Sequence, residues 1–308
     1  MTIAAGRHAT EEEIATYREH GVVCLRQALP AEWLDVLRET MSELERTWKE
    51  RKAAGRGAEM PSMSPGPEDV AVFSLNNWEA DKVLSEQEVE SEGGDFIVSA
   101  LLINNPNFLG LRRLAFESPL PMLMGELFGS SKVLFGMDQE FIKEPGAIRR
   151  TAFHQDEPYF NVSGEHCASV WIAPEPVDER NGRMGYVRGS HRWATHAANR
   201  FVSQEKIFPD EFDKLPQLPD IEGNEDDFDI VYYDVEPGDA IVHHYRLVHG
   251  ARGNVDATRG RRALSLRYTG DDAYYLLRGP QYPMDPTLTD GDPLDSETFP
   301  VVWRAPAS

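Results

Sequence analysis

His154 and Asp156 form a His-x-Asp triplet, and the chain supplies His249 and then the basic residue Arg261 much farther along. Two imidazoles and one carboxylate can cap one face of an octahedral ferrous ion and leave the opposite face open to other ligands. A guanidinium beyond the last of these residues offers a planar pair of donors that matches a carboxylate. The residue types therefore indicate an iron site that receives O2 and a dicarboxylate, 2-oxoglutarate.

These side chains must be brought together by the fold, because His249 lies 95 positions after His154 (249 minus 154). Within a strand, residues i and i+2 point to the same side, so His154 and Asp156 can both face the interior of a rolled sheet. His249 would come from another strand. A single histidine is more often a hydrogen-bonded core or surface residue than a ligand, so the assignment depends on the rest of the chain.

Many short β-rich segments separated by Gly, Pro and Asp follow Ser131, which is typical of a jelly roll or barrel. We therefore predict a mainly β fold with flanking helices and a double-stranded β-helix (jelly-roll, cupin-like) core. The segments are 133–135, 140–142, 168–172, 184–187, 230–233, 240–242 and 263–268.

The chain is predicted to form one domain, residues 1–308, of which 131–275 make the β-helix core. Residues 1–130 are expected to be a mostly helical flank. A helix over 11–20 ends at Gly21, and the Gly-, Pro- and Ser-rich stretch 52–67 is interpreted as a lid-like loop. Residues 276–308 read as an extended C-terminal arm.

The formal net charge of -21 disfavours nucleic acid and anionic membranes as partners, because both are negative themselves. No run reaches the roughly 18 apolar residues of a membrane span, and residues 1–10 lack the apolar core of a secretory signal. A cytoplasmic protein is expected. Cys24 and Cys167, the two cysteines, are expected to stay reduced thiols, and a Cys-type zinc site is excluded.

The order of several motifs resembles the phytanoyl-CoA dioxygenase family over roughly residues 10–275. The triplet is followed by a Trp-x-Ala strand, an Asn-Gly turn, a Gly-Ser-His, a Pro-Gly-Asp, a His-Gly with a nearby Asn, and an Arg. In this chain the motifs are Trp171-Ile172-Ala173, Asn181-Gly182, Gly189-Ser190-His191, Pro237-Gly238-Asp239, His249-Gly250 with Asn254, and Arg261-Arg262-Ala263-Leu264.

The resemblance implies that His154, Asp156 and His249 are the iron ligands and that Arg261 binds 2-oxoglutarate. Arg261 lies 12 positions after His249 (261 minus 249), one more than is usual in the family. The basic, small and aliphatic residues that follow it still fit the family pattern, and Arg262 is kept as the alternative. The extra position falls in the loop 253–260.

The co-substrate pocket is expected to include Trp171, with Lys143 and Gln139 as weaker candidates from the strand before the triplet. One departure from the family is Ala251, where a Ser usually helps to hold the co-substrate. Either another group, such as Thr151, Gln139 or a water, satisfies the carboxylate, or 2-oxoglutarate binds more weakly.

Tyr159 and Phe160 are candidates for the substrate mouth, although aromatic residues beside a core strand are equally often packing residues. Asn104 is expected to sit in a turn helped by Pro106, with substrate contact as the alternative.

The remaining histidines are read as supporting residues. Of His243 and His244 only one can face inward, and we interpret His244 as the residue that supports the ligands or the core. His191 is expected to be a turn element and His166 to be exposed.

These features predict an Fe(II)/2-oxoglutarate-dependent dioxygenase that hydroxylates a C–H bond of a small metabolite or natural-product intermediate and releases succinate and CO2. Asp156 argues against halogenation, because related halogenases have a small residue there. The acidity of the chain favours a neutral or cationic substrate, and the oligomeric state is open. The alternatives are a cupin-like binding or structural protein with a vestigial metal site and a zinc hydrolase of the same fold.

Overall fold

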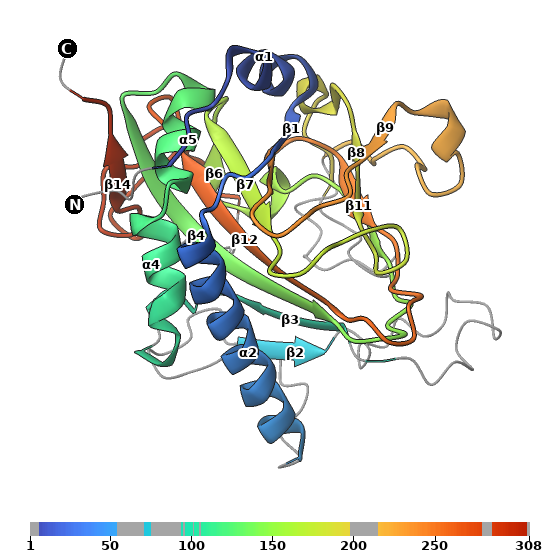
Figure 1. Ribbon diagram of the computed structural model, residues 1–308. Helices are drawn as coiled ribbons and strands as arrows, with labels where there is room; N and C mark the ends of the chain where they lie inside the picture. The colour runs from blue at the N-terminus through green and yellow to red at the C-terminus, as the bar shows by residue number, and fades with distance from the viewer. Residues whose placement is uncertain are drawn as a thin grey trace.

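The computed structural model describes residues 6–53, 71–74, 94, 96–100, 102–104, 106–197, 215–278 and 285–306. Its helices are α1 (Glu11–His20), α2 (Ala31–Ala53), α4 (Leu109–Glu117) and α5 (Leu120–Phe128), with short 3-10 turns at η3 (Pro106–Phe108), η4 (Glu157–Tyr159), η5 (Ser190–Arg192) and η7 (Glu225–Asp227). Helices α2, α4 and α5 flank one large sheet (Figure 1).

The limits of α1 follow from its terminal residues. The Thr10 hydroxyl accepts a hydrogen bond from the Glu13 amide, and the Glu13 carboxylate accepts one from the Thr10 amide, so two unsatisfied amides of the first turn are bonded. Gly21 ends the helix at φ 74°, a left-handed conformation that costs glycine little. The helix predicted over 11–20 is confirmed.

The large sheet is antiparallel and has the strand order β1-β10-β7-β12-β4-β3-β2, with β14 also paired to β4. Its long central strand β4 merges two segments that the sequence suggested were separate. The strands are β1 (Val22–Leu25), β2 (Ala71–Ser74), β3 (Phe96–Ala100), β4 (Lys132–Lys143), β7 (Cys167–Ile172), β10 (Ala240–His244), β12 (Arg261–Thr269) and β14 (Val301–Arg304).

A smaller antiparallel sheet has the order β5-β11-β8-β9 and lies across the large sheet from the helices (Figure 1). Its strands are β5 (Thr151–His154), β8 (Met184–Val187), β9 (Ile230–Tyr232) and β11 (His249–Ala251), and β6 (Val162–Ser163) pairs separately with β13 (Tyr274–Tyr275). Two facing antiparallel sheets with helices on one outer side confirm the expected jelly-roll core.

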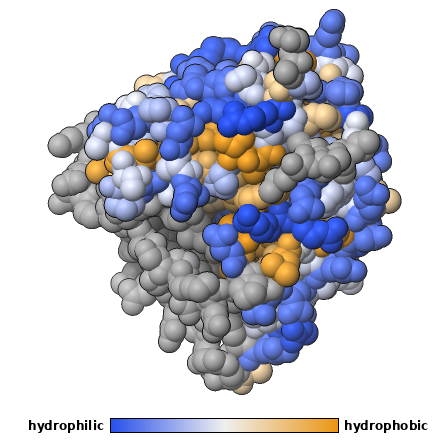
Figure 2. Space-filling model, turned by 90° about the vertical axis from the view of Figure 1, so that its left-hand side faces the viewer, coloured by the Kyte–Doolittle hydropathy of each residue, from blue (hydrophilic) through white to orange (hydrophobic). Residues whose placement is uncertain are grey.

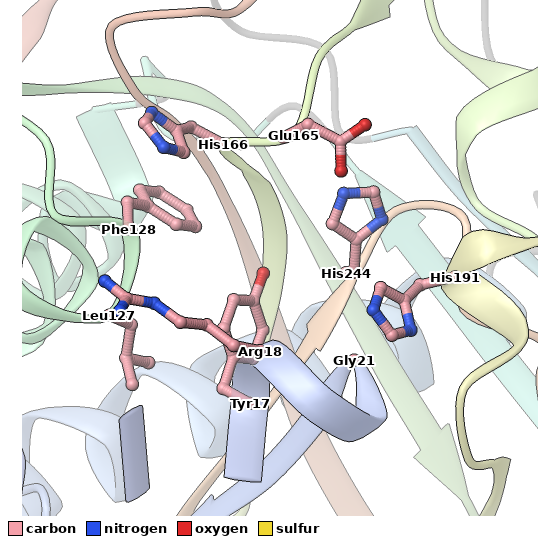
Figure 3. A pocket seen from close by; sticks show the side chains of 9 residues that line it. All are labelled: Tyr17, Arg18, Gly21, Leu127, Phe128, Glu165, His166, His191 and His244. Carbon is pink, nitrogen blue, oxygen red and sulfur yellow. The ribbon is translucent and has the colours of Figure 1, made fainter. Parts of the chain in front are cut away.

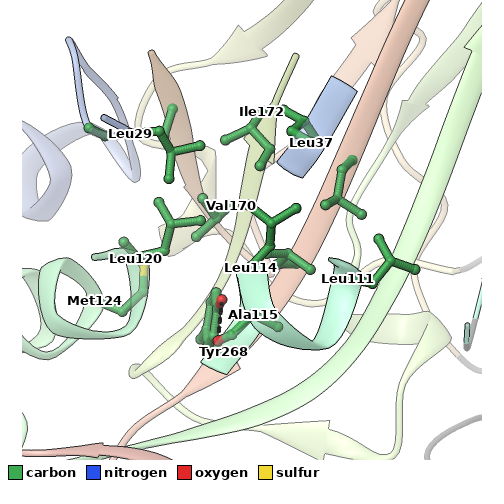
Figure 4. Packing of buried hydrophobic residues seen from close by; sticks show 14 of the residues in the cluster. Leu29, Leu37, Leu111, Leu114, Ala115, Leu120, Met124, Val170, Ile172 and Tyr268 are labelled. Carbon is green, nitrogen blue, oxygen red and sulfur yellow. Dashed lines mark hydrogen bonds between the residues drawn. The ribbon is translucent and has the colours of Figure 1, made fainter. Parts of the chain in front are cut away.

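The alternation of side chains along the large sheet separates a helix-facing core from a polar interior. On β12, Leu264, Leu266 and Tyr268 pack against the helices, and the Tyr268 hydroxyl donates to the Ala115 carbonyl at 3.0 Å (Figure 4). The residues that alternate with them along β12, such as Arg261 and Arg267, point to the smaller sheet. Truncating a fully buried leucine of this core to alanine would cost about 2–5 kcal/mol.

The flanks contain more strand than the sequence suggested. Strands β2 and β3 lie within the predicted, mostly helical flank 1–130, and β14 lies in the arm 276–308, whereas β1 was expected as a strand. All four strands complete the large sheet, since pairing satisfies backbone groups that an isolated arm would leave to water. Of the lid-like loop predicted over 52–67, residues 54–67 lie outside the described residues, while 52 and 53 end α2. The one-domain division stays a prediction.

No helix among the described residues is long and apolar enough to cross a membrane. Figure 2 shows the face on the α4 and β14 side of the molecule, where hydrophilic side chains surround a central group of hydrophobic ones. Cys24 and Cys167 are free thiols, as expected.

Candidate active site

The two candidate histidine ligands come from neighbouring strands of the smaller sheet. His154 ends β5, His249 begins β11, and the two are direct partners across the antiparallel pair. Their ring centroids lie 4.3 Å apart. The pairing explains how residues so far apart in the sequence meet, because directly opposed side chains of a sheet share one face.

Asp156 reaches the same place by a bend and not by strand alternation, which differs from the predicted arrangement. Strand β5 ends at His154, and Asp156 has helical dihedral angles of φ -73° and ψ -39°. Its amide donates to the Tyr245 carbonyl at 2.8 Å, which holds the bend. Gln155 turns away and bonds the carbonyls of Ala194 and Arg246.

The donor atoms of these residues converge. Asp156 Oδ1 lies 3.8 Å from His154 Nε2 and 3.9 Å from His249 Nε2, and one ligand atom from each residue falls within 4.8 Å of the others. All three side chains are buried. This is the one such group of three among the described residues. The spacing suits a single ion between them.

Hydrogen bonds on the far side of each imidazole set its tautomer. His154 Nδ1 lies 2.8 Å from the Ala152 carbonyl, and His249 Nδ1 lies 2.9 Å from the Leu247 carbonyl. A carbonyl oxygen can only accept, so each Nδ1 carries the hydrogen and each Nε2 keeps its lone pair. The lone pairs are therefore on the atoms that face Asp156, which is the state a metal ligand requires.

Burial favours the neutral form of both rings. It lowers the pKa of His154 to about 3 and that of His249 to about 4, in each case more than the nearby charge of Asp156 raises it. For Asp156, burial works to raise the pKa, but Arg267 and His243 outweigh it and hold the pKa well below its usual range. Two neutral imidazoles and a carboxylate at neutral pH fit a ferrous ion.

A row of three side chains across the large sheet supports Asp156. His243 on β10 pairs with Ser169 on β7, which pairs with Arg267 on β12, and all three point inward. The Ser169 hydroxyl donates to Asp156 Oδ2 at 2.6 Å, His243 Nε2 lies 3.5 Å from the same oxygen, and Arg267 Nη2 lies 3.6 Å from Oδ1. The row fixes the carboxylate from behind.

His244 was expected to support the ligands or the core: it is buried but does not contact the ligands, and His243 takes that place. Ala240 and Val242 of β10 pack toward the helices, so alternation puts His244 on their side and His243 on the inside. His244 instead lines a separate pocket with Tyr17, His166 and His191, shown in Figure 3. The signal that could have found His243 was the parity of the apolar residues before it.

Arg261 lies on the inner face of β12 at its first residue. Its Nη1 donates to the Gly182 carbonyl at 2.7 Å, and its guanidinium carbon lies 5.8 Å from the Trp171 ring centroid. Arg262 points to the opposite face and bonds Glu175 and Ser42. Alternation thus separates the two arginines.

The charge of Arg261 has no counter-ion in the part of the chain that the structure describes. Among the described residues no carboxylate forms an ion pair with Arg261, and its Nε has no hydrogen-bond partner. Burial lowers its pKa to about 10, so it remains a cation at neutral pH. A buried, unneutralised guanidinium fits the far carboxylate of 2-oxoglutarate.

The two weaker pocket candidates lie at different levels of β4. Lys143 is the direct partner of Arg261, and its Nζ donates at 2.8 Å to the carbonyls of Arg149 and Arg252. Burial, and then the charge of Arg261, lowers the Lys143 pKa well below its usual range. Gln139 lies farther along and accepts a hydrogen bond from Arg267 at 2.8 Å. Lys143 is thus beside Arg261, whereas Gln139 is beside Asp156.

The three candidates for substrate contact also lie in different parts of the structure. Tyr159 meets His154 edge to face at a centroid distance of 5.9 Å, and Phe160 lies under the Arg267 guanidinium at 4.8 Å. Asn104 is exposed. The turn that contains Asn104 is held by Asp138, which bonds the amides of the two preceding residues from the helix-facing side of β4. The structure therefore brings Tyr159 and Phe160 to the ligands but shows Asn104 as a turn residue.

The Ala251 position remains without a hydroxyl of its own. Ala251 is buried and pairs with Thr151 of β5 across an irregularity in register. Thr151 is therefore the proposed replacement that neighbours Ala251 in the sheet. Gln139 is instead engaged with Arg267.

Sequence reasoning missed Ser169 and Arg267 as well as His243. Arg267 follows Arg261 by an even number of positions on one strand, so the alternation that puts Arg261 inside also puts Arg267 inside. Ser169 carried no such signal, because a serine inside an apolar strand is common.

Comparison with known proteins agrees with this geometry. A family model described as phytanoyl-CoA dioxygenase (PhyH) matches residues 17–263. Phytanoyl-CoA dioxygenase domain-containing protein 1 of Danio rerio is 25% identical over 275 residues, which are 81% of this chain and 87% of that protein. Phytanoyl-CoA dioxygenase 1 of Oryza sativa subsp. japonica is 27% identical over 124 residues, only 40% of either chain.

Solved structures share the fold. The non-heme alpha-ketoglutarate-dependent carbocyclase SnoK from nogalamycin biosynthesis is 23% identical, with 96% of this chain and 97% of that chain covered and a TM-score of 0.61. The epimerase SnoN, solved with Fe3+, alpha-ketoglutarate and nogalamycin RO, is 22% identical, with 95% and 98% covered and a TM-score of 0.61. The family match over most of the chain shows that this protein belongs to the phytanoyl-CoA dioxygenase family and is a 2-oxoglutarate-dependent non-heme iron enzyme.

Proposed function

We propose that the protein hydroxylates a C–H bond of a small metabolite or natural-product intermediate, with 2-oxoglutarate converted to succinate and CO2. His154, Asp156 and His249 would hold the iron, and Arg261 would hold the far carboxylate of 2-oxoglutarate. The observation that carries the proposal is the pair of tautomers fixed by Nδ1 bonds, which turns both lone pairs toward Asp156.

Bound iron, 2-oxoglutarate and O2 together supply the oxidant for such a reaction. The chain contributes position and exclusion of water. Arg261 and Trp171 would orient the co-substrate from one end of β12, while Ser169 and His243 keep the Asp156 carboxylate in place. Tyr159, which contacts the His154 ring, and Phe160, which contacts Arg267, would shield the reacting carbon from water.

Two features bear on the alternatives. A vestigial metal site would have no reason to keep the tautomer bonds and the supporting row around Asp156 intact. A zinc hydrolase would have no use for a buried guanidinium without a carboxylate partner among the described residues. Thr151 is proposed to replace the hydroxyl missing at Ala251. A cytoplasmic location stays a prediction.

The test is release of succinate from 2-oxoglutarate by the purified protein with Fe(II) and ascorbate, first alone and then with a panel of small metabolites. We expect slow turnover without substrate and faster, coupled turnover with a hydroxylated product when a substrate is present. His154→Ala should abolish both. Turnover that persists in His154→Ala, or wild-type protein that neither binds iron nor forms succinate, would contradict the proposal.

A further inference from the structure

The charges that face the iron site do not balance once the co-substrate is included. Ferrous iron and 2-oxoglutarate would cancel each other, and Asp156 offsets one of the two inward guanidiniums, Arg261 and Arg267. At least one positive charge remains, whether or not the buried Lys143 amine beside Arg261 is protonated. Glu157, the next acid along the chain, does not compensate it, because Glu157 pairs with Arg278 at 2.7 Å.

Arg267 carries the surplus charge in a buried position. Its side chain is only 4% exposed, and its guanidinium stacks on the Phe160 ring at 4.8 Å. Nη2 donates to Gln139 at 2.8 Å, whereas Nε and Nη1 have no hydrogen-bond partner among the described residues. Buried donors of a charged group are costly to leave unsatisfied, so a ligand that satisfies them gains affinity.

The location of Arg267 beside the metal ligands indicates that the ligand that gains this affinity is the substrate. Nη2 lies 3.6 Å from Asp156 Oδ1, the oxygen nearest to both Nε2 atoms, so the guanidinium borders the metal position. Arg261 lies at the other end of the strand, beside Trp171 and Lys143, and is the group suited to the far carboxylate of the co-substrate. Arg267 contacts Asp156 through Nη2 only, so its unbonded Nε and Nη1 are the donors that a further anion could use.

We infer that the substrate carries an anionic oxygen group, of the carboxylate class, that binds Arg267 beside the iron. This inference rests on the proposed function and refines it, because the acidity of the whole chain by itself favours a neutral or cationic substrate. The charge of Arg267 outweighs the negative charge of the chain at this site, because a buried cation a few ångströms away is screened far less than the exposed surface acids. Phe160 beneath the guanidinium would hold the apolar part of the same substrate.

The experiment measures binding and requires no knowledge of the natural substrate. The protein is loaded with paramagnetic Mn(II) in place of iron and with N-oxalylglycine, a stable analogue that fills the co-substrate pocket. Acetate and its neutral isostere acetamide are then titrated separately, and the paramagnetic relaxation of their methyl protons reports binding close to the metal. The variants are Arg267→Gln, Arg267→Lys and, as a matched control on the opposite face of the same strand, Arg262→Gln.

We expect acetate to bind about tenfold more tightly than acetamide in the wild type and in Arg262→Gln, because a charged hydrogen bond exceeds a neutral one by roughly that factor. The preference should vanish in Arg267→Gln and survive in part in Arg267→Lys. Equal relaxation by the two probes in the wild type, or a preference that persists in Arg267→Gln, would overturn the inference.

Binding of Mn(II) itself, followed by electron paramagnetic resonance, separates the two levels of failure. Saturable Mn(II) binding without an acetate preference refutes the anionic substrate alone. Absence of Mn(II) binding refutes the proposed function, and the inference falls with it. If Arg267→Gln loses Mn(II), Arg267→Lys decides the question: a preference for acetate equal to that of the wild type would refute the inference, and a reduced preference would support it.

Discussion

Ser169 offers a direct test of how the protein holds its metal-binding carboxylate. Its hydroxyl donates to Asp156 Oδ2 at 2.6 Å, and both partners are buried, so water cannot replace the bond. In Ser169→Ala the carboxylate loses this donor while the cavity created is the size of one oxygen atom. The substitution should therefore act on the carboxylate and leave the packing of β7 intact.

The size of the effect follows from the acceptor being charged. A hydrogen bond to a charged group is worth about 1.5–3 kcal/mol, which corresponds to roughly 10- to 100-fold in an equilibrium constant. Loss of a group that supports a metal ligand has the same range of effect on metal affinity. We expect Ser169→Ala to bind divalent metal about 10- to 100-fold more weakly.

Isothermal titration with Co(II) under anaerobic conditions measures this difference directly. Ser265→Ala is the matched control, since Ser265 is a buried serine on the adjacent strand whose paired residue is Trp171. That control should keep wild-type affinity. A folded Ser169→Ala protein with unchanged Co(II) affinity would refute the view that this row of side chains orients Asp156.

Three further predictions concern the co-substrate, the ligands and pH. Arg261→Gln should raise the KM for 2-oxoglutarate by at least about 100-fold, because breaking a buried charge pair costs about 3–5 kcal/mol, whereas Arg262→Gln should change it little; steady-state succinate release measures both, and equal effects would contradict the assignment. His249→Ala should lose stoichiometric metal, measured by elemental analysis, while keeping its circular dichroism spectrum; full metal content would exclude His249 as a ligand. Burial lowers the pKa of His244 to about 3 in the folded state, below the ordinary histidine value of 6.5. The contribution of the neutral ring to the free energy of unfolding is therefore complete above pH 6.5 and is lost as the pH falls toward 3. In metal-free protein, urea unfolding should show a slope of free energy against pH that is about 1.4 kcal/mol per pH unit shallower in His244→Gln between these limits; an unchanged slope would show that His244 is not buried in its neutral form.

Most of what could be predicted about the site follows from the alternation of side chains between the two faces of each strand. The apolar residues Leu264 and Leu266 set the helix-facing side of β12, and this alternation alone leaves Arg261 on the inside and Arg262 outside. The same parity, applied to Val242, would have selected His243 over His244. The prediction that His244 supports the ligands failed because the parity of these apolar residues was not applied to the pair.

Other features depend on tertiary contacts that no local pattern encodes. Asp156 enters the site through a bend held by the Tyr245 carbonyl, and a two-residue spacing is equally compatible with a strand. Ser169 and Arg267 become partners of Asp156 only because β7, β10 and β12 are neighbours in this order. Pairing order of distant strands is a property of the whole sheet, so these supporting residues could not be derived from the sequence.

The most direct test of the central claim is a crystal structure of the protein grown anaerobically with Fe(II) and 2-oxoglutarate, with anomalous scattering recorded on both sides of the iron edge. We predict a single anomalous peak among His154 Nε2, His249 Nε2 and Asp156 Oδ1, with 2-oxoglutarate extending from it toward Arg261. A fully loaded crystal with its iron peak elsewhere, or with 2-oxoglutarate bound away from Arg261, would contradict the account.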